Sequence, residues 1–365
     1  MKILVLNPIL FSGVDNILPK VDTIKDTMIY SMCLGFKKLG YDVTLIAMED
    51  YRPQKEENWD FEIIFVKGNL DSCLHKALPL SFDIWSFLKY HAPEYDIVLS
   101  SEVFSFHSLF ASLIAPYKTI IWQELTTHQK KMHGIPSLLW HNIIARLLMR
   151  RVKAVVPRSK KAYDFISHYM PKTVETIVDH GISVEKFKFC RDKKRQIISS
   201  SQLIYRKNVD GIIRTFSKLH QKKSYKDVKL LIAGRGEEEQ SLKALVADLK
   251  LQANVVFLGF LPQATLNEYI KESYCFLVNT RQDLNMVSIP ESIVSGTPIL
   301  TNMIPASADY IKREHLGIAK DNWNENDIME LIENNSTYVD KCISYREKLT
   351  SVHSAQLLVD IFLNE

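Results

Sequence analysis

Two carboxylates, Asp283 and Glu291, stand eight positions apart in the segment QDLNMVSIPESIVSGTP at residues 282–298. The apolar run CFLVNT at 275–280 comes directly before them and predicts a buried strand that ends at this segment. Two carboxylates beside a sugar can orient its hydroxyl groups, or they can act as acid and base in the hydrolysis of a glycosidic bond. Spacing in sequence does not determine the distance between the two groups in space, so both interpretations stay open.

The same segment also predicts the start of a helix. Ser288 and Glu291 match the S-x-x-E pattern of a capping box, with Pro290 early in the helix. Helix capping alone would explain Glu291. A helix start also offers backbone N–H groups and a positive dipole end to an anion such as a diphosphate, so a ligand-binding role for Glu291 is compatible with capping.

The loop after another predicted strand supplies a cation. The run IISSS at 197–201 is followed by QLIYRKNVDGI, in which Lys207 could reach the same anion, although a solvated lysine is the simpler interpretation. Gly234 and Gly236 are similar to a phosphate-binding loop, but the third glycine of a dinucleotide-binding motif is missing and EEEQ follows directly. We therefore interpret this turn as structural.

Strand-like and helix-like segments alternate along most of the chain, which predicts parallel sheets built from βαβ units. The alternation is lost around residues 183–195 and then starts again, so the 365 residues are expected to form two Rossmann-like α/β domains. We expect these domains at 1–185 and 186–350, a terminal helix at 351–365, and a ligand site in the cleft between the two sheets. The predicted strands are KILVL, DVTLIA, EIIFV, DIVLS, TIIW, AVVP and ETIV in the first half, and IISSS, VKLLIAG, NVVFLG, YCFLVN and PILTN in the second.

The composition, with 46% hydrophobic and 24% charged residues, is typical of a soluble globular protein. The apolar run at the start of the sequence is too short for a signal peptide, and no stretch approaches about 18 consecutive apolar residues, so a cytoplasmic location is expected. The five cysteines are scattered and form no C-x-x-C pair, a pattern that favours reduced thiols over a disulfide framework or a zinc site.

One segment is strongly basic: between Leu125 and Tyr163 there are nine Lys or Arg residues and no Asp or Glu. Residues 137–152 within it have the period of an amphipathic helix. Residues 128–161 could attach the protein to the anionic inner face of the cell membrane, or the apolar side of the helix could pack on the core. Nucleic acid is set aside, because no recognition motif accompanies the charge. The helix is expected to place Leu139, Trp140, Ile143, Ile144, Leu147 and Leu148 on one side and Asn142, Arg146, Arg150 and Lys153 on the other.

Taken together, the loops of the second half resemble those of the family-four retaining glycosyltransferases, which have the GT-B fold of two Rossmann-like domains. The family typically shows G-R-L-x-x-x-K-G, G-x-G-x-x-x-x-x-L, V-x-F-x-G-x-x-P and E-x-x-x-x-x-x-x-E in this order. The corresponding segments of this chain are SQLIYRKN, GRGEEEQSL, VVFLGFLP and DLNMVSIPE. The resemblance extends over nearly the whole chain, and in relatives the last helix returns to the first domain.

The resemblance implies a role for each matching residue. Lys207 would bind the diphosphate of a nucleotide sugar, Asp283 would lie near the hydroxyl groups of the donor sugar, and Glu291 would hold the ribose. The backbone amides of the loop before Glu291 would complete this cradle, and the residues after the VVFLG run would border the base. These further donor-binding candidates are Asn285, Met286, Val287 and Phe260.

Gln202 departs from the family pattern, because relatives usually have an arginine there that pairs with the lysine on the pyrophosphate. A charged hydrogen bond contributes about 1.5–3 kcal/mol, so the change could weaken stabilisation of the leaving group by roughly one to two orders of magnitude. Arg206, which is adjacent to Lys207, or Arg281 could compensate. In the first domain, Glu124 follows the run TIIW near the position of a family histidine and could orient or deprotonate an acceptor hydroxyl, or be a solvated residue at a strand end.

The sequence therefore predicts a glycosyltransferase that acts, with retention, in the synthesis of surface polysaccharides or glycoconjugates. The donor is a nucleotide sugar, with a UDP-sugar favoured, and the acceptor is a saccharide or a lipid-linked saccharide. No metal and no further cofactor are expected, because Lys207 and the helix-start amides would stabilise the leaving group. Two alternatives remain: a nucleotide-sugar epimerase with the same fold, and a non-catalytic relative that binds a partner glycosyltransferase.

Overall fold

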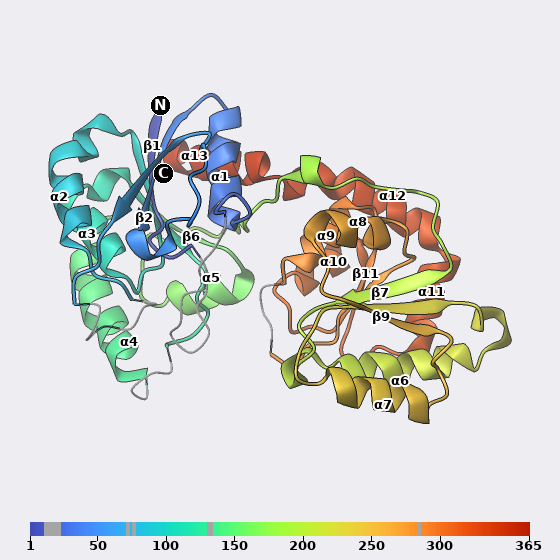
Figure 1. Ribbon diagram of the computed structural model, residues 1–365. Helices are drawn as coiled ribbons and strands as arrows, with labels where there is room; N and C mark the ends of the chain where they lie inside the picture. Colours follow the sequence, from blue (N-terminus) through green and yellow to red (C-terminus); the bar gives the residue numbers. More distant parts are fainter. Residues whose placement is uncertain (11–22, 71–73, 75–77, 130–133, 283–285) are drawn as a thin grey trace. The chain divides into compact units, whose positions relative to one another are not determined.

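The computed structural model describes residues 1–365 apart from 11–22, 71–73, 75–77, 130–133 and 283–285 (Figure 1). The chain forms two compact units. Unit 1 contains Met1–Ile182 and Thr350–Glu365, and unit 2 contains Ser183–Leu349. The division expected from the sequence was at 185/186, and the terminal segment belongs to unit 1.

Unit 1 is built on a six-stranded parallel sheet with the strand order β3-β2-β1-β4-β5-β6. Its strands are β1 (Lys2–Leu6), β2 (Asp42–Met48), β3 (Glu62–Val66), β4 (Ile97–Ser101), β5 (Thr119–Gln123) and β6 (Ala154–Pro157). Its helices are α1 (Met28–Lys38), α2 (Phe82–His91), α3 (Phe106–Ile114), α4 (Ile135–Leu139), the π-helix η5 (Trp140–Met149), α5 (Lys160–Ile166) and α13 (Ser351–Asn364), with short 3-10 turns η1 (Glu49–Tyr51), η2 (Ala92–Glu94) and η3 (Pro116–Lys118).

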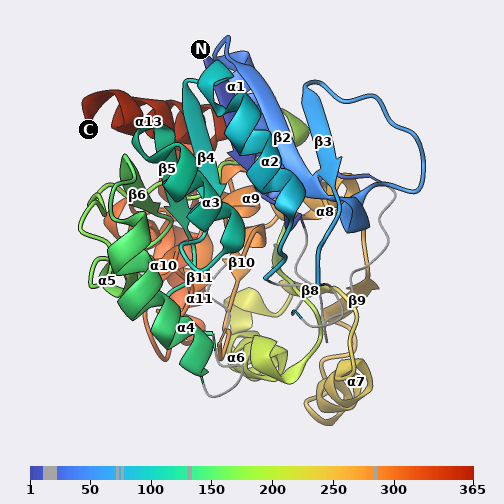
Figure 2. The same cartoon turned by 90° about the vertical axis from the view of Figure 1, so that its left-hand side faces the viewer.

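Both faces of this sheet are covered. Alternate residues of β1 point to opposite faces, so that Ile3 and Val5 pack with α1 and α13, whereas Leu4 and Leu6 pack with α2 and α3. Helices α2 and α3 lie side by side on their face (Figure 2). Strands buried on both faces have near-continuous apolar sequences, which is why runs such as KILVL predict them.

The chain leaves unit 1 after Ile182 and returns to it at Thr350, and these two positions are neighbours in unit 1. Ile182 pairs with Thr350 in an isolated parallel bridge, and the N–H of Ser351 donates to the carbonyl of Ile182 at 3.1 Å. Gly181 makes this approach possible, because a Cβ at that position would lie 2.3 Å from the backbone N and Cα of Ser351. From there α13 packs along α1.

Unit 2 also contains a six-stranded parallel sheet, in the order β12-β11-β10-β7-β8-β9. Its strands are β7 (Gln196–Ser200), β8 (Lys229–Ala233), β9 (Val255–Gly259), β10 (Phe276–Leu277), β11 (Ile299–Thr301) and β12 (Gly317–Ala319). Its helices are α6 (Val209–His220), α7 (Glu239–Asp248), α8 (Gln263–Lys271), α9 (Ser288–Val294), α10 (Ala308–Arg313), α11 (Glu325–Glu333) and α12 (Asn335–Tyr345), with 3-10 turns η6 (Val184–Lys186), η7 (Tyr205–Lys207), η8 (Lys223–Tyr225) and η9 (Arg346–Leu349).

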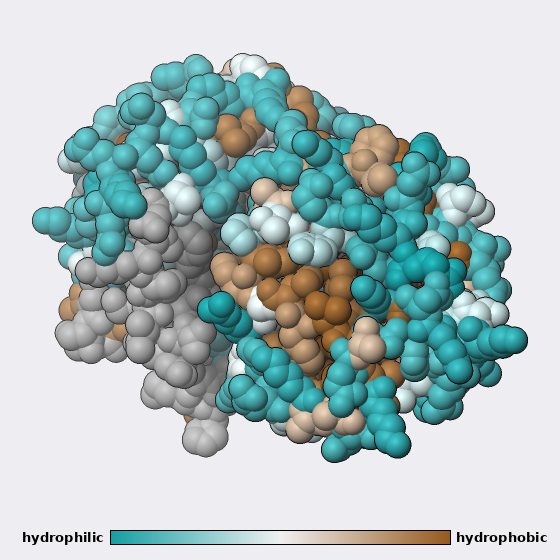
Figure 3. Space-filling model, turned by 45° about the vertical axis from the view of Figure 1, so that its right-hand side comes forward, coloured by the Kyte–Doolittle hydropathy of each residue, from teal (hydrophilic) through white to brown (hydrophobic). Residues whose placement is uncertain are grey.

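The core of unit 2 joins strands β7, β8, β10 and β11 to helices α6, α7 and α11. On the face shown in Figure 3, hydrophilic side chains cover most of the right-hand part, and a hydrophobic area lies near the centre. The glycine-rich turn after β8 packs against the loop after β7: a Cβ on Gly234 would lie 1.8 Å from the carbonyl oxygen of Ser201, and Gly234 has φ +131. These contacts agree with the structural interpretation of this turn.

Two predictions about strands were wrong. Residues 175–178, ETIV, form no strand, although Thr173 just before them makes an isolated bridge to Val155. Strand β12 was missed, because its three residues, GIA, are too short to show a pattern.

The faces of the basic helix also differ from the prediction. The side chains that pack inward are Trp140, His141, Ala145 and Met149, whereas Leu139, Ile143, Leu147 and Leu148 are about half or more exposed. The alternative in which the predicted apolar side packs on the core is therefore wrong for most of its residues. None of the helices in the described ranges has the length and apolar character required to span a membrane.

Gly181 provides a test of the contact between the two chain crossings. We expect Gly181→Ala to lower the free energy of unfolding by about 3 kcal/mol or more, because the atoms it would crowd are backbone atoms that cannot move aside. Urea unfolding followed by circular dichroism would measure this loss. Gly40→Ala is the comparison for conformational strain without crowding and should cost about 1 kcal/mol, since Gly40 has φ +85 and nothing lies within 4 Å of the added Cβ. An equal, small loss in both variants would show that the approach at Gly181 is not tight.

Candidate functional site

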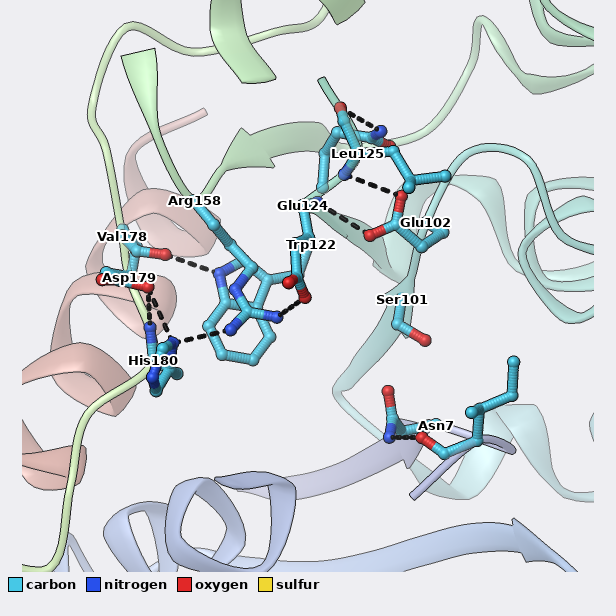
Figure 4. A network of polar contacts seen from close by, with 12 residues as sticks. Asn7, Ser101, Glu102, Trp122, Glu124, Leu125, Arg158, Val178, Asp179 and His180 are labelled. Atoms are coloured by element: carbon cyan, nitrogen blue, oxygen red, sulfur yellow. Dashed lines mark hydrogen bonds and ion pairs between the residues drawn. The ribbon is translucent and has the colours of Figure 1, made fainter. Parts of the chain in front are cut away.

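Three neighbouring strands of unit 1 end in charged residues. Glu102 follows β4, Glu124 is the first residue after Gln123 at the end of β5, and Arg158 follows β6. Because the three strands are parallel and adjacent, these residues lie together at the carboxyl edge of the sheet (Figure 4).

The carboxylate of Glu102 holds the backbone after β5. One of its oxygens accepts the N–H of Glu124 at 2.8 Å and the other accepts the N–H of Leu125 at 3.2 Å. Burial, and then the negative charge of Glu124, raise the pKa of Glu102 to about 7. The neighbouring Gln123 is also structural, because its side chain accepts the N–H of Val103 at 2.9 Å and donates to the carbonyl of Leu125 at 3.0 Å.

Arg158 holds the side chain of Glu124. Its Nη1 lies 2.5 Å from Glu124 Oε2, and its Nη2 lies 2.7 Å from Nδ1 of His180. The same Nδ1 lies 2.8 Å from the carboxylate of Asp179, so His180 contacts both charged groups. The guanidinium also lies over the ring of Trp122, with 4.4 Å between its carbon and the ring centroid. The side chain of Arg158 is 11% exposed and that of Glu124 is 35% exposed, so the carboxylate is the more accessible partner.

In unit 2 the loops after β7 and β10 are joined at the carboxyl edge. Turn η7 contains Arg206 and Lys207, and the carbonyl of Arg206 accepts from the Oγ1 of Thr280 at 3.0 Å and from the N–H of Arg281 at 2.7 Å. Lys207 therefore belongs to a loop that contacts the start of the segment leading to α9. Asp283 and Asn285 in that segment lie outside the described residues.

Arg281 has partners within unit 2. Its guanidinium forms an ion pair with Asp210 at 3.2 Å, donates to the carbonyl of Tyr205 and lies 4.0 Å from the centroid of the Tyr205 ring. Gln202 is exposed in the same loop, and Arg206 is exposed beside it. Of the two arginines considered as replacements for the family arginine, Arg281 already has its charge balanced by a carboxylate.

The capping-box prediction was wrong. Helix α9 begins at Ser288, with Val287 at the N-cap position and no side-chain cap. The carboxylate of Glu291 is buried and accepts from Nε2 of Gln263, at the start of α8, at 2.6 Å. Phe260, just beyond β9, is 71% exposed, and Met286 and Val287 lie directly before α9. Glu291 is thus joined to the segment that follows β9.

Sequence reasoning missed Glu102, Arg158 and Gln263. Arg158 stands directly after AVVP, and Glu102 follows DIVLS with only Ser101 between, so the rule that ligands bind beyond strand ends would have marked both positions as candidates. Gln263 carries no comparable signal, because its contact with Glu291 depends on how α8 packs against α9.

Comparisons with known proteins extend these observations. Residues 183–346, nearly all of unit 2, match the family model of glycosyl transferases group 1. The chain is 22% identical over 329 residues to alpha-monoglucosyldiacylglycerol synthase of Streptococcus pneumoniae, covering 83% of this chain and 73% of that protein. It is 24% identical over 292 residues to the O-antigen biosynthesis glycosyltransferase WclY of Escherichia coli, covering 74% of this chain and 78% of that protein.

The structure is similar to that of Anabaena Alr3699/HepE in complex with UDP, with a TM-score of 0.69, 11% sequence identity and full coverage of both chains. The two parallel sheets with their helices and this likeness confirm the predicted fold class. Residues 183–346 form a glycosyl transferases group 1 domain, and the chain is a glycosyltransferase with the GT-B fold, related to the family-four enzymes that its sequence resembles.

Proposed function

We propose that this enzyme transfers a sugar, with retention of anomeric configuration, from a nucleoside-diphosphate sugar to a hydroxyl group of a membrane glycolipid or lipid-linked saccharide. The observation that carries the proposal is the alignment over most of both chains with a synthase whose name specifies a glucosylated diacylglycerol. The O-antigen relative and the UDP complex of a protein with a similar fold support the same class of donor and acceptor.

Unit 2 would bind the donor. When the bond between the anomeric carbon and the phosphate oxygen breaks, its electron pair leaves with the nucleoside diphosphate, and the developing negative charge needs nearby cations and N–H groups. We assign Lys207 and Arg206 to the diphosphate, Glu291 to the ribose, and Asp283 with the segment 285–287 to the sugar and phosphate. Gln202 would contribute a neutral hydrogen bond, and Phe260 would border the base. This arrangement would require no metal ion.

Unit 1 would bind the acceptor. The acceptor oxygen forms the new bond to the anomeric carbon, and its proton moves to a base, either the Glu124 carboxylate or an oxygen of the leaving phosphate. Glu124 is assigned here because its side chain is partly exposed at the carboxyl edge of the sheet while its charged neighbour Arg158 is mostly buried. A carboxylate in that position could orient the acceptor hydroxyl before it reacts.

The helix formed by α4 and η5 would bring the enzyme to its acceptor. Ile135, Leu139, Ile143 and Leu147 follow one another at intervals of four residues, and all four are at least half exposed. Arg146 and Arg150 are exposed beside them on the same helix or at its end. An apolar stripe next to cations fits the interface of an anionic bilayer, into which the apolar side chains insert while arginines meet lipid phosphates.

The donor assignment is tested first by nucleotide binding. We expect one nucleoside diphosphate, with UDP favoured, to raise the melting temperature of the wild type, because ligand at a hundredfold its dissociation constant adds about 2.7 kcal/mol. Lys207→Ala should weaken this binding by about tenfold to a hundredfold, since it removes a charged hydrogen bond. Glu291→Gln should also weaken it while keeping an oxygen for Gln263. Thermal unfolding with UDP, ADP, GDP, UDP-glucose and UDP-galactose measures these effects.

Lys218→Ala is the control, because Lys218 is exposed on α6 in the last turn, away from η7. It should bind nucleotide like the wild type. Normal binding by both site variants would overturn the donor assignment. Transfer of the sugar to dioleoylglycerol in vesicles should persist in EDTA, whereas isomerisation of the donor without acceptor would indicate an epimerase instead.

The membrane assignment is tested by sedimentation with vesicles. We expect the wild type to bind vesicles that contain phosphatidylglycerol more tightly than vesicles of phosphatidylcholine alone, in a salt-sensitive manner. Leu147→Asp should weaken binding by about tenfold or more, because it removes an inserting side chain and adds a negative charge. Arg150→Gln should weaken it by about fivefold, as expected for roughly 1 kcal/mol per basic residue.

The matched control for Leu147→Asp is Leu363→Asp, because the two leucines are 64% and 62% exposed and Leu363 lies on α13. If both variants bind vesicles equally well, the α4–η5 helix is not the membrane-binding surface.

A further inference from the structure

Glu102 is held in an unfavourable backbone conformation. Its φ is +64, in the left-handed region that residues with a Cβ rarely adopt. Its N–H donates to the carbonyl of Trp122 at 3.1 Å, and its own carbonyl accepts from the Oγ of Ser105 at 2.7 Å. Strain that the surroundings enforce in this way is typical of functional sites.

The adjacent end of β4 is also fixed. The carbonyl of Ser101 accepts from Nε2 of His107 at 2.8 Å and from the hydroxyl groups of Ser105 and Ser108, each at 3.1 Å. His107 and Ser108 are buried. The left-handed turn at Glu102 therefore starts from a rigid strand end, and it directs the carboxylate to the two N–H groups that follow β5.

Arg158 holds Glu124 from the other side of β5, because it follows β6 whereas Glu102 follows β4. One end of its guanidinium contacts Glu124 and the other contacts His180, so the plane of the group is fixed at two points above the Trp122 ring. Trp122 is itself held, because its indole N–H donates to the carbonyl of Val178 at 2.7 Å. The strand ends on both sides of β5 thus converge on Glu124, one through its backbone and one through its side chain.

A purely structural turn would not need these charges. Burying a carboxylate and a guanidinium carries a desolvation cost that neutral hydrogen-bonding groups would largely avoid. Glu102 and Arg158 are both partly buried, and the side chain of Arg158 is 11% exposed against 35% for the Glu124 carboxylate that it holds. Charges in this arrangement are useful where a reacting carboxylate must be kept within a fraction of an ångström of its working position.

We propose that Glu102 and Arg158 are positioning residues for Glu124, which Glu102 fixes through the backbone N–H groups of residues 124 and 125 and Arg158 fixes through the carboxylate. The inference rests on the proposed function, in which Glu124 orients or deprotonates the acceptor hydroxyl. His180 supports it indirectly, because its Nδ1 lies 2.7 Å from the second amino group of Arg158 and 2.8 Å from the carboxylate of Asp179.

The environment of the Glu102 carboxylate can be tested without substrate. Its pKa is raised from 4.5 to about 7, so between these values the folded protein binds the proton more tightly than the unfolded chain. The contribution of Glu102 to the free energy of unfolding should therefore decrease as the pH rises from about 4.5 to about 7. Glu102→Gln keeps Glu124 and Arg158, the charged groups that face it from β5 and β6, but does not titrate.

Urea unfolding of the wild type and of Glu102→Gln at each pH measures the difference. We expect the free energy of unfolding of the wild type to fall relative to that of Glu102→Gln as the pH rises over this range. A difference that does not change with pH would contradict the raised pKa of Glu102 and, with it, the role given to this residue.

The positioning role is tested by a double-mutant cycle. With the donor identified by nucleotide binding and dioleoylglycerol as acceptor, we expect Glu124→Gln to lower kcat by about a hundredfold. Arg158→Lys should lower it by about tenfold, because lysine keeps the charge but cannot contact Glu124 and His180 as a fork. The double variant should stay within about twofold of Glu124→Gln alone, since Arg158 acts through Glu124. The KM for the nucleotide sugar should not change.

Arg52→Lys is the matched control, because Arg52 pairs with Glu49 at 2.6 Å in unit 1, outside the network. Losses that multiply in the double variant would overturn the inference. The inference would also be overturned if Arg158→Lys and Glu102→Gln both react at the wild-type rate while Glu124→Gln is slow. That result would leave the role of Glu124 intact. A wild-type rate for Glu124→Gln, or no turnover of any donor, would instead overturn the proposed function and the inference with it.

Hydrogen exchange gives a second measurement that does not depend on activity. Glu102→Gly is compatible with φ +64 but removes the carboxylate. The amides of residues 124 and 125 should then exchange at least about tenfold faster, while the amide of Ile121 within β5 stays protected. Unchanged exchange at residues 124 and 125 would show that Glu102 does not hold this segment.

Discussion

The parallel pairing of buried strands is the constraint on which both candidate sites depend. It brings all the carboxyl ends of a sheet to one edge, where the backbone leaves the ladder and its polar groups need new partners. In unit 1 the carboxylate of Glu102 satisfies two N–H groups beyond β5. In unit 2 the carbonyl of Arg206 beyond β7 is satisfied by the segment beyond β10. In both units, the groups that complete the backbone hydrogen bonding also place the charged side chains.

The sequence predicts the sheets better than it predicts the sites. Runs such as KILVL and TIIW identify strands because a strand buried on both faces is apolar at nearly every position. The same signal is too weak for GIA of β12 and misleading for ETIV, whose apolar residues are not paired in a sheet. Chain alternation also predicts two α/β domains, but the packing of α13 on α1 was implied by the family resemblance and has no local signal.

The residues around Glu124 show why sites are harder to predict. Glu124 could be suggested from the family pattern, but Glu102 and Arg158 are single charged residues that would look like solvated strand ends in isolation. Their relation appears only when the strand order β4-β5-β6 is known, because that order makes residues 102, 124 and 158 neighbours. Glu291 shows the opposite error: local spacing indicated a cap, whereas in the structure its carboxylate accepts from Gln263 across two packed helices.

The described residues of the basic segment from Leu125 to Tyr163 do not form one surface. Arg158 is mostly buried against Glu124, and Lys160 pairs with Asp164 at 2.9 Å, so these two charges are balanced within unit 1. Arg146 donates to the carbonyl of His168 at 2.9 Å and is exposed together with Arg150 beside the apolar stripe. Counting charges along the sequence therefore overstates the cations available to a membrane, and the exposed apolar side chains become the stronger argument. A similar balance holds in unit 2, where Arg281 is paired with Asp210.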